Sequence, residues 1–118
     1  MHRDVKPNNI FFKSGHLKLA DFGFCKKLKN FDDLTQTSLG SPLYMAPEVL
    51  NGDVYDSKAD VWSVGIVLYE MLFGRCPYGD CNIKQLINVY SADKLRIQMA
   101  TENIFISPST ENMLRRML

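Results

Sequence analysis

Four side chains near the start of the sequence have the types needed to bind phosphate groups and a metal ion. The carboxylate of Asp4, the ammonium of Lys6 and the amide of Asn9 lie within the first nine residues. A second carboxylate, Asp21, follows twelve residues after Asn9. A lysine balances the charge of a phosphate, and carboxylate and amide oxygens are the ligands that hard cations prefer. One site can use all four if the chain between them folds back on itself.

The segment between Asn9 and Asp21 is expected to fold as a β-hairpin. Residues 10–12 and 17–20 read as short strands, and Ser-Gly-His between them reads as the turn. Asn9 and Asp21 are equally far from Gly15, so a hairpin centred on that glycine places them opposite each other, about 5 Å apart at the β-carbon. Mg²⁺ usually takes one or two protein oxygens and completes its shell with phosphate and water. The pair is therefore predicted to hold Mg²⁺.

Three ordered motifs resemble the catalytic half of a eukaryotic protein kinase. They are His-Arg-Asp-x-Lys-Pro-x-Asn at residues 2–9, Asp-Phe-Gly at 21–23 and Gly-Ser-Pro-Leu-Tyr-Met-Ala-Pro-Glu at 40–48. One such motif is weak, but three in the right order at matching spacing are specific. The chain is identified as a member of this family, and its motifs are most similar to those of the autophagy-initiating kinases.

The resemblance implies transfer of the terminal phosphate of ATP to Ser or Thr hydroxyls of protein substrates, with ATP and Mg²⁺ as cofactors. Asp4 would orient the acceptor hydroxyl and accept its proton, and Lys6 would steady the transferred phosphate. Asn9 and Asp21 would hold Mg²⁺. The residues implied in nucleotide binding are Phe11, Lys6, Asn9 and Asp21. Lys6 is also typical of Ser/Thr kinases rather than tyrosine kinases.

By the same resemblance, residues 24–46 correspond to the activation loop. Thr37 is the expected phosphosite because it lies four residues before Ser41. A phosphate there would bring nearly two negative charges, which Arg3 and Lys26 could grip, ordering the loop.

A substrate platform and several structural contacts complete the implied site. The platform would be formed by Ser41, Pro42, Leu43 and Met45, which line the pocket for the residue after the acceptor. Phe24 resembles kinases that prefer serine over threonine. The structural residues are His2 and Phe22, stacked on each other, Asp60, bonded to the backbone of the His-Arg-Asp loop, and Glu48. In the family Glu48 pairs with an arginine, which is expected beyond Leu118.

The rest of the chain is expected to be mostly helical. Residues 55–73 are predicted as a central helix, with Ser57 as its N-cap and Gly74 as its stop. Apolar residues go most of the way round, so this helix should be buried on nearly all sides, and its Asp60 must be hydrogen-bonded. The strand at residues 10–12 should pack against it. Shorter helices are predicted at 82–90 and from Ser107 to the end.

The predicted fold class is therefore α+β, a mostly helical kinase-like large lobe with a small β-hairpin and no small lobe. Residues 1–118 are expected to be one partial kinase domain, from the catalytic loop through the penultimate helix of that lobe. The chain has no Gly-x-Gly pair. The resemblance implies that the glycine-rich loop and the ATP-binding lysine lie upstream of Met1, so the 118-residue chain is expected to be a fragment that is inactive alone.

Composition adds few constraints. The hydrophobic content of 46% and charged content of 23% are ordinary for a globular protein, and the net charge of +1 gives no reason to expect a nucleic-acid partner. The 3 cysteines have no metal-ligand spacing and fit reduced thiols in a cytoplasmic protein. The longest apolar stretch, 61–73, is too short to span a bilayer. The oligomeric state stays open.

Two other functions compete with an active protein kinase. A non-catalytic, pseudokinase-like fragment would act by binding, but it would be expected to have lost Asp4, Asn9 or Asp21. A small-molecule phosphotransferase would share the base and the metal ligands. Residues 40–48 argue against it, because that motif is a platform for protein substrates.

Overall fold

Two strands, four helices and three 3₁₀ turns follow one another along the described residues, which are 1–27, 40–79, 81–91 and 104–118 of the computed structural model. The strands are β1 (Ile10–Lys13) and β2 (His16–Leu19), and the helices are α1 (Pro47–Leu50), α2 (Lys58–Phe73), α3 (Ile83–Ser91) and α4 (Pro108–Met117). The turns are η1 (Pro7–Asn9), η2 (Phe22–Phe24) and η3 (Pro42–Tyr44). The predicted α+β class, mostly helical with one small hairpin, is confirmed.

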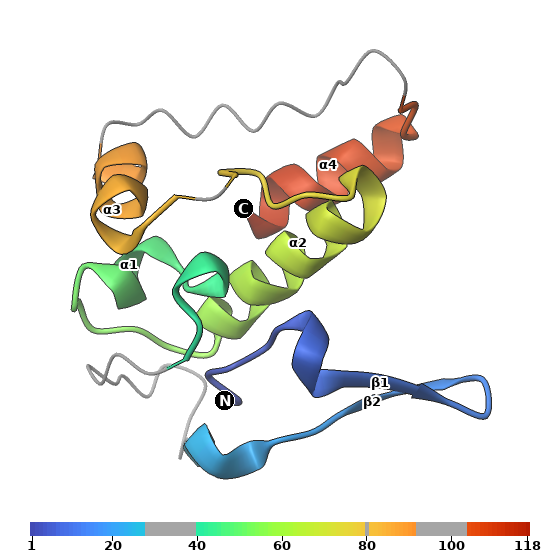
Figure 1. Ribbon diagram of the computed structural model, residues 1–118, viewed down its shortest axis with the longest axis horizontal. Coiled ribbons are helices and arrows are strands. Elements are labelled where there is room, and N and C mark those ends of the chain that lie inside the picture. Colours follow the sequence, from blue (N-terminus) through green and yellow to red (C-terminus); the bar gives the residue numbers. More distant parts are fainter. Residues whose placement is uncertain (28–39, 80, 92–103) are drawn as a thin grey trace.

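Helix α2 is the element on which the others are arranged (Figure 1). Helix α4 lies along the C-terminal half of α2, α1, η3 and α3 gather nearer its N-terminal half, and the hairpin extends away from the helices. The larger hydrophobic cluster joins the platform, α1, α2 and α3 through Ala46, Val49, Tyr55, Ala59, Trp62, Ile66 and Leu86. A smaller cluster joins α2 to α4 through Tyr69, Phe73 and Leu114.

The hairpin forms, but its register differs by one residue from the prediction. Only Ser14 and Gly15 make the turn, with φ of 52° and 78°. Two-residue turns with both φ values positive match the twist of paired strands, which is why they are favoured in hairpins. Asn9 consequently faces Ala20, whose N–H donates to the Asn9 carbonyl at 2.8 Å. The predicted pairing of Asn9 directly with Asp21 was wrong, because it assumed a three-residue turn.

The ends of α2 are set by two residues. Ser57 occupies the N-cap position, but its side chain makes no capping hydrogen bond. Asp56 caps the helix instead, accepting a bond from the Lys58 N–H at 2.7 Å. Gly74 ends the helix with a φ of 69°, the left-handed conformation expected of a C-terminal glycine.

One side of α2 is exposed, which contradicts the prediction of burial on nearly all sides. Val61, Val64 and Met71 are 45%, 42% and 75% exposed, and their spacing places them on one face. Phe12 of β1 is 74% exposed, so the predicted packing of this strand against Met71 is also wrong. Sequence shows how apolar a face is, but burial also depends on whether another element covers it.

The two shorter helices begin within one residue of their predicted starts. Asn82 and Gln85 exchange reciprocal hydrogen bonds of 2.9 and 3.0 Å at the start of α3. Ser107 caps α4 by accepting from the Thr110 N–H at 3.1 Å. No helix among the described residues is long and apolar enough to cross a membrane.

Candidate active site

Asp60 of α2 fixes the loop at residues 1–9. Its Oδ2 accepts from the His2 N–H at 2.7 Å, and its Oδ1 accepts from the Arg3 N–H at 2.8 Å. Arg3 adopts a φ of 70°, in the left-handed region that costs a bulky residue about 1–3 kcal/mol. Hydrogen bonds to a charged group stabilise by about 1.5–3 kcal/mol each, so two of them offset this strain. The predicted contact between Asp60 and the loop backbone is present.

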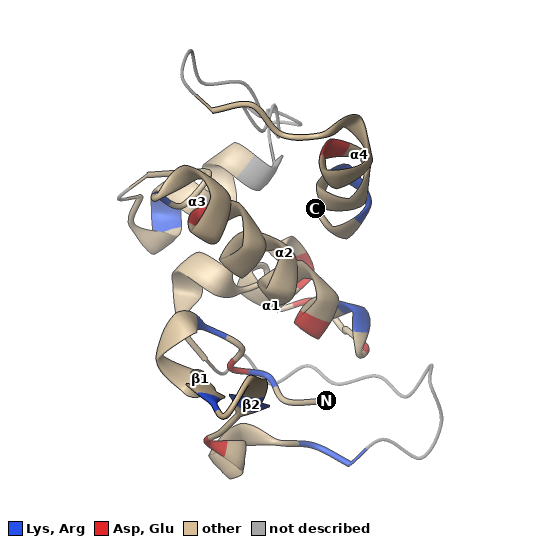
Figure 2. Ribbon diagram, turned by 90° about the vertical axis from the view of Figure 1, so that its right-hand side faces the viewer, with Lys and Arg blue, Asp and Glu red and all other residues tan. Residues whose placement is uncertain are grey.

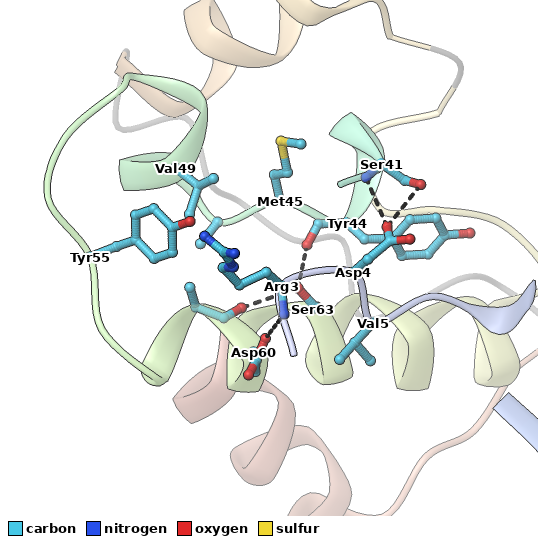
Figure 3. Close-up of a pocket in the computed structure, with 12 residues that line it drawn as sticks. Arg3, Asp4, Val5, Ser41, Tyr44, Met45, Val49, Tyr55, Asp60 and Ser63 are labelled. Carbon is cyan, nitrogen blue, oxygen red and sulfur yellow. Dashed lines mark hydrogen bonds between the residues drawn. The ribbon is translucent and has the colours of Figure 1, made fainter. Parts of the chain in front are cut away.

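Asp4 is buried and its carboxylate is fully hydrogen-bonded. Lys6 Nζ lies 2.8 Å from Oδ2, and Asn9 Nδ2 donates to the same oxygen at 3.1 Å. The N–H and the hydroxyl of Ser41 donate to Oδ1 at 3.1 and 3.2 Å (Figure 3). A carboxylate offers about four lone-pair sites. These four donors fill them.

These contacts decide the charge of Asp4. Burial raises the pKa of its carboxyl, but the hydrogen bond and charge of Lys6, with the hydrogen bonds from Ser41 and Asn9, outweigh burial. The net pKa is therefore lowered from 3.8. Asp4 is therefore ionised at neutral pH, and its carboxylate acts only as a hydrogen-bond acceptor.

Lys6 and Ser41 connect Asp4 to the substrate platform. Lys6 Nζ donates to Ser41 Oγ at 2.9 Å while pairing with Asp4. The structure thus joins residues from the start of the chain to a motif more than thirty positions later.

Gly40 allows this junction. It has a φ of 116°, and a β-carbon added there would lie 2.5 Å from the Arg3 carbonyl oxygen. Only glycine fits such a close backbone approach without a shift. The motif alone does not reveal this role, because it depends on which backbone lies opposite.

Asn9 and Asp21 fit Mg²⁺ by their donor types. Both hydrogen bonds of the buried Asn9 side chain are made by Nδ2, to the carbonyl and carboxylate of Asp4. The Asn9 Oδ1 takes part in neither of these two hydrogen bonds. The exposed Asp21 carboxylate accepts one bond, from the Gly23 N–H at 3.3 Å. An amide oxygen and a carboxylate match what Mg²⁺ takes from protein when phosphate and water supply the rest. Among the described residues no cluster of three or more His, Cys, Asp or Glu side chains offers another such site.

The platform is bonded to α2 at two points. Ser63 donates to the Tyr44 carbonyl at 2.7 Å, and the Tyr44 hydroxyl donates to Glu70 at 2.9 Å. Burial, with the hydrogen bond to Glu70, raises the pKa of Tyr44. The other platform residues, Pro42, Leu43 and Met45, are half-buried beside it. Glu70 therefore supports the platform from α2.

The sequence contained a signal for these supports that motif comparison missed. Asp60, Ser63 and Glu70 are polar residues at spacings of three and seven within an apolar helix. Such spacing places them on one face. A polar stripe on an otherwise apolar helix indicates a face that holds hydrogen-bonded loops.

The remaining predicted residues are placed as follows. The rings of His2 and Phe22 meet edge-on with centroids 5.0 Å apart. Phe11 is 55% exposed on β1. Glu48 is half-buried, and it makes no ion pair with any residue that the structure describes.

Arg3 contacts the first residue of the predicted activation loop, and Lys26 belongs to the described start of that loop. The Arg3 side chain donates to the Phe24 carbonyl, and Met1 and Lys26 exchange backbone hydrogen bonds of 3.0 and 3.2 Å. Thr37 itself lies outside the described residues. Its contact with these cations stays a prediction.

A cavity of about 20 Å³ lies behind Asp4, among Arg3, Tyr44, Asp60 and Ser63 (Figure 3). This is room for about one water molecule. It is too small for a nucleotide.

Comparison with known proteins gives one consistent family. The family model described as protein kinase domain matches residues 1–118. The Serine/threonine-protein kinase atg1 of Dictyostelium discoideum is 42% identical over 122 residues, and ULK3 of Xenopus laevis is 40% identical over 120. The Serine/threonine-protein kinase akt-1 of Caenorhabditis elegans is 43% identical over 97 residues.

The alignments cover most of this chain but little of its relatives. They span 100%, 99% and 81% of the chain, against 17%, 25% and 18% of the three relatives. The relatives named atg1, ULK3 and akt-1 are similarly identical to this chain, at 42%, 40% and 43%.

Replacing Lys6 by Met should destabilise the protein by about 1–3 kcal/mol near neutral pH, because buried Asp4 would lose its charged partner. The folded-state pKa of Asp4 is lowered, so its ionised form contributes stability above its ordinary pKa, and this is lost as pH falls through the folded value. The stability difference between wild type and Lys6→Met should therefore shrink below about pH 4. Urea unfolding across a pH series measures it. Lys58→Met, at an exposed lysine, is the control, and a difference that is constant down to acid pH would contradict the expectation.

Replacing Gly40 by Ala should weaken the bond between the Ser41 N–H and Asp4, because the added methyl group collides with the Arg3 carbonyl. Hydrogen–deuterium exchange at the Ser41 amide should become at least about tenfold faster, the equivalent of about 1.4 kcal/mol. Gly52→Ala is the matched control, since Gly52 also has a positive φ but an added β-carbon meets nothing within 4 Å. Equal exchange at Ser41 in both variants would show that the collision is relieved at no cost.

Proposed function

Because this chain belongs to the protein kinase family, we propose that it supplies the catalytic and substrate-binding segment of a Ser/Thr protein kinase. Residues 1–118 would extend from the catalytic loop through the penultimate helix of the large lobe. The observation that carries the proposal is the carboxylate of Asp4, buried and ionised between Lys6, Asn9 and Ser41.

Asp4 would accept a hydrogen bond from the acceptor hydroxyl and take its proton as the new bond to phosphorus forms. Since all four lone-pair sites of Asp4 are filled, one donor must give way. The Ser41 hydroxyl is the best candidate, because its bond of 3.2 Å is the longest of the four and Ser41 keeps its N–H bond to the same oxygen. A lowered pKa makes Asp4 a weak base, so its main contribution is to orient the hydroxyl.

Lys6 would stabilise the negative charge of the transferred phosphate. Its Nζ already bridges Asp4 and Ser41, so a short movement of a flexible side chain brings the ammonium to a phosphate beside them.

Asn9 and Asp21 would hold Mg²⁺ through the Asn9 Oδ1 and the Asp21 carboxylate. When bound, the ion neutralises charge on the phosphates of ATP. Exposed Phe11 would offer an apolar surface to the adenine.

No disulfide joins Cys25, Cys76 or Cys81 in the described part of the chain, which fits a reducing compartment, so we place the activity in the cytoplasm. Protein substrates with Ser or Thr acceptors are proposed, and Phe24 after Asp-Phe-Gly favours serine. Nothing in the charge of +1 favours a nucleic acid.

The non-catalytic alternative is less well supported, since Asp4, Asn9 and Asp21 are all present. We nevertheless propose that the 118-residue chain is inactive by itself. The exposed apolar face of α2 and the exposed Phe12 need a covering element, and the implied glycine-rich loop and ATP-binding lysine are outside this sequence.

Asp4→Asn in the longest form of the protein that can be purified should lower phosphorylation of a Ser-containing peptide by about 100- to 10,000-fold. ATP affinity should change little, because Asp4 is not proposed to bind the nucleotide. The measurement is kcat with radiolabelled ATP beside a direct binding assay, with exposed Asp53→Asn as the control. The isolated 118-residue chain, run in parallel, should be inactive. Absence of phosphorylation by the longer wild-type protein, with Asp4→Asn indistinguishable from it, would favour the non-catalytic reading.

Thr37→Ala should lower the activity of the longer protein several-fold, and Thr37→Glu should retain part of it, since a carboxylate supplies some of the charge of a phosphate. Phosphorylation at Thr37 is measured by mass spectrometry of the active enzyme. Two variants with wild-type activity would show that Thr37 is not the switch.

A further inference from the structure

An open groove of about 520 Å³ lies beside the substrate platform. Its walls are Pro42 and Leu43 on one side and the start of α3 on the other, and the full lining is Pro42, Leu43, Cys81, Asn82, Ile83 and Lys84. The volume falls within the range of small-ligand sites and admits one or two side chains of a peptide.

The groove is connected along the chain to a residue that is bonded to Asp4. Pro42 directly follows Ser41, whose N–H and hydroxyl are bonded to Asp4. An extended peptide advances about 3.3 Å per residue, so a chain whose acceptor hydroxyl lies at Asp4 reaches the groove within a few residues. This continuity favours the substrate itself as the occupant.

Both walls are held in place. Leu43 packs against the larger hydrophobic cluster, and η3 contacts α3. The reciprocal bonds between Asn82 and Gln85 fix the first turn of α3. The groove is therefore formed before a peptide binds.

The groove has an apolar lining and one cationic rim. Ile83 is 51% exposed, although it is an apolar residue at the start of a helix. Lys84 is exposed and forms no ion pair with any described residue. It is also the only charged residue between positions 81 and 91, so α3 offers no carboxylate to balance it (Figure 2).

We propose that Lys84 is a specificity-determining residue that selects protein substrates with an acidic side chain within four positions after the acceptor, next to an apolar side chain in the groove. The inference rests on the proposed kinase function and deepens it. Apolar contacts with Leu43 and Ile83 hold the peptide, and the charge of Lys84 discriminates between peptides. An exposed ion pair of this kind gives about a two- to fivefold preference, which weakens as salt rises.

The test uses the longest purified form of the protein and matched peptides that carry Glu or Lys at each of the four positions after a serine. Wild type should prefer Glu at one of them by about two- to fivefold in kcat/KM. Lys84→Gln should abolish the preference, and Lys84→Glu should reverse it. Lys58→Glu, an equal charge change at the exposed start of α2, should leave it intact.

The role of Lys84 and the proposed kinase function would be overturned by different results. Peptide phosphorylation without any Glu preference, or with a preference that Lys84→Glu leaves unchanged, overturns the role of Lys84 and leaves the kinase function standing. Absence of phosphorylation of every peptide by wild type, with Asp4→Asn indistinguishable from it, overturns the proposed function and this inference together. Thermal unfolding should be unchanged in all three variants, because both lysines are exposed.

Discussion

A carboxylate placed within an apolar helix needs hydrogen-bond donors, and Asp60 takes them from the backbone of the loop at residues 1–9. The two N–H groups of His2 and Arg3 converge on it, and Arg3 adopts a left-handed φ of 70° in doing so. That conformation turns the next residue, Asp4, away from α2 and toward Ser41. The rest of the site depends on this bond pair, because Asp4 collects Lys6, Asn9 and Ser41 around itself only from that position.

The same helix holds the other half of the site. Ser63 and Glu70 bond to Tyr44, the last residue of η3, from the face of α2 that also carries Asp60. The loop and the platform are thus both hydrogen-bonded to the same helix. This shared attachment keeps Asp4 and Ser41 at hydrogen-bonding distance. The smaller cluster between α2 and α4 includes Tyr69 and Leu114, so the helix is itself anchored at its far end.

The sequence predicted the local structural features and the contacts that the kinase motifs imply. The hairpin, the stop at Gly74 and the hydrogen-bonded state of Asp60 follow from turn chemistry, capping and burial of charge. The hairpin register could not be fixed, because a two-residue and a three-residue turn both fit Ser-Gly-His and differ by one position at every pair. The collision that restricts position 40 to glycine depends on the Arg3 carbonyl, 37 residues away. The exposure of Val61 and Met71 depends on whether another element packs against them, and the spacing of apolar residues in the sequence does not show this.

In the proposed function, the saturation of Asp4 would link substrate binding to chemistry. A carboxylate with four donors gains nothing from a fifth, so an acceptor hydroxyl must replace one of them. If the Ser41 hydroxyl yields, its oxygen keeps the hydrogen bond that it already accepts from Lys6 at 2.9 Å. Exchange of one hydrogen bond for another costs little compared with leaving a buried carboxylate unsatisfied. In the proposed function, the four-donor arrangement would keep Asp4 ionised and correctly placed before substrate arrives, and it would give up only one hydrogen bond from a neutral donor when substrate binds.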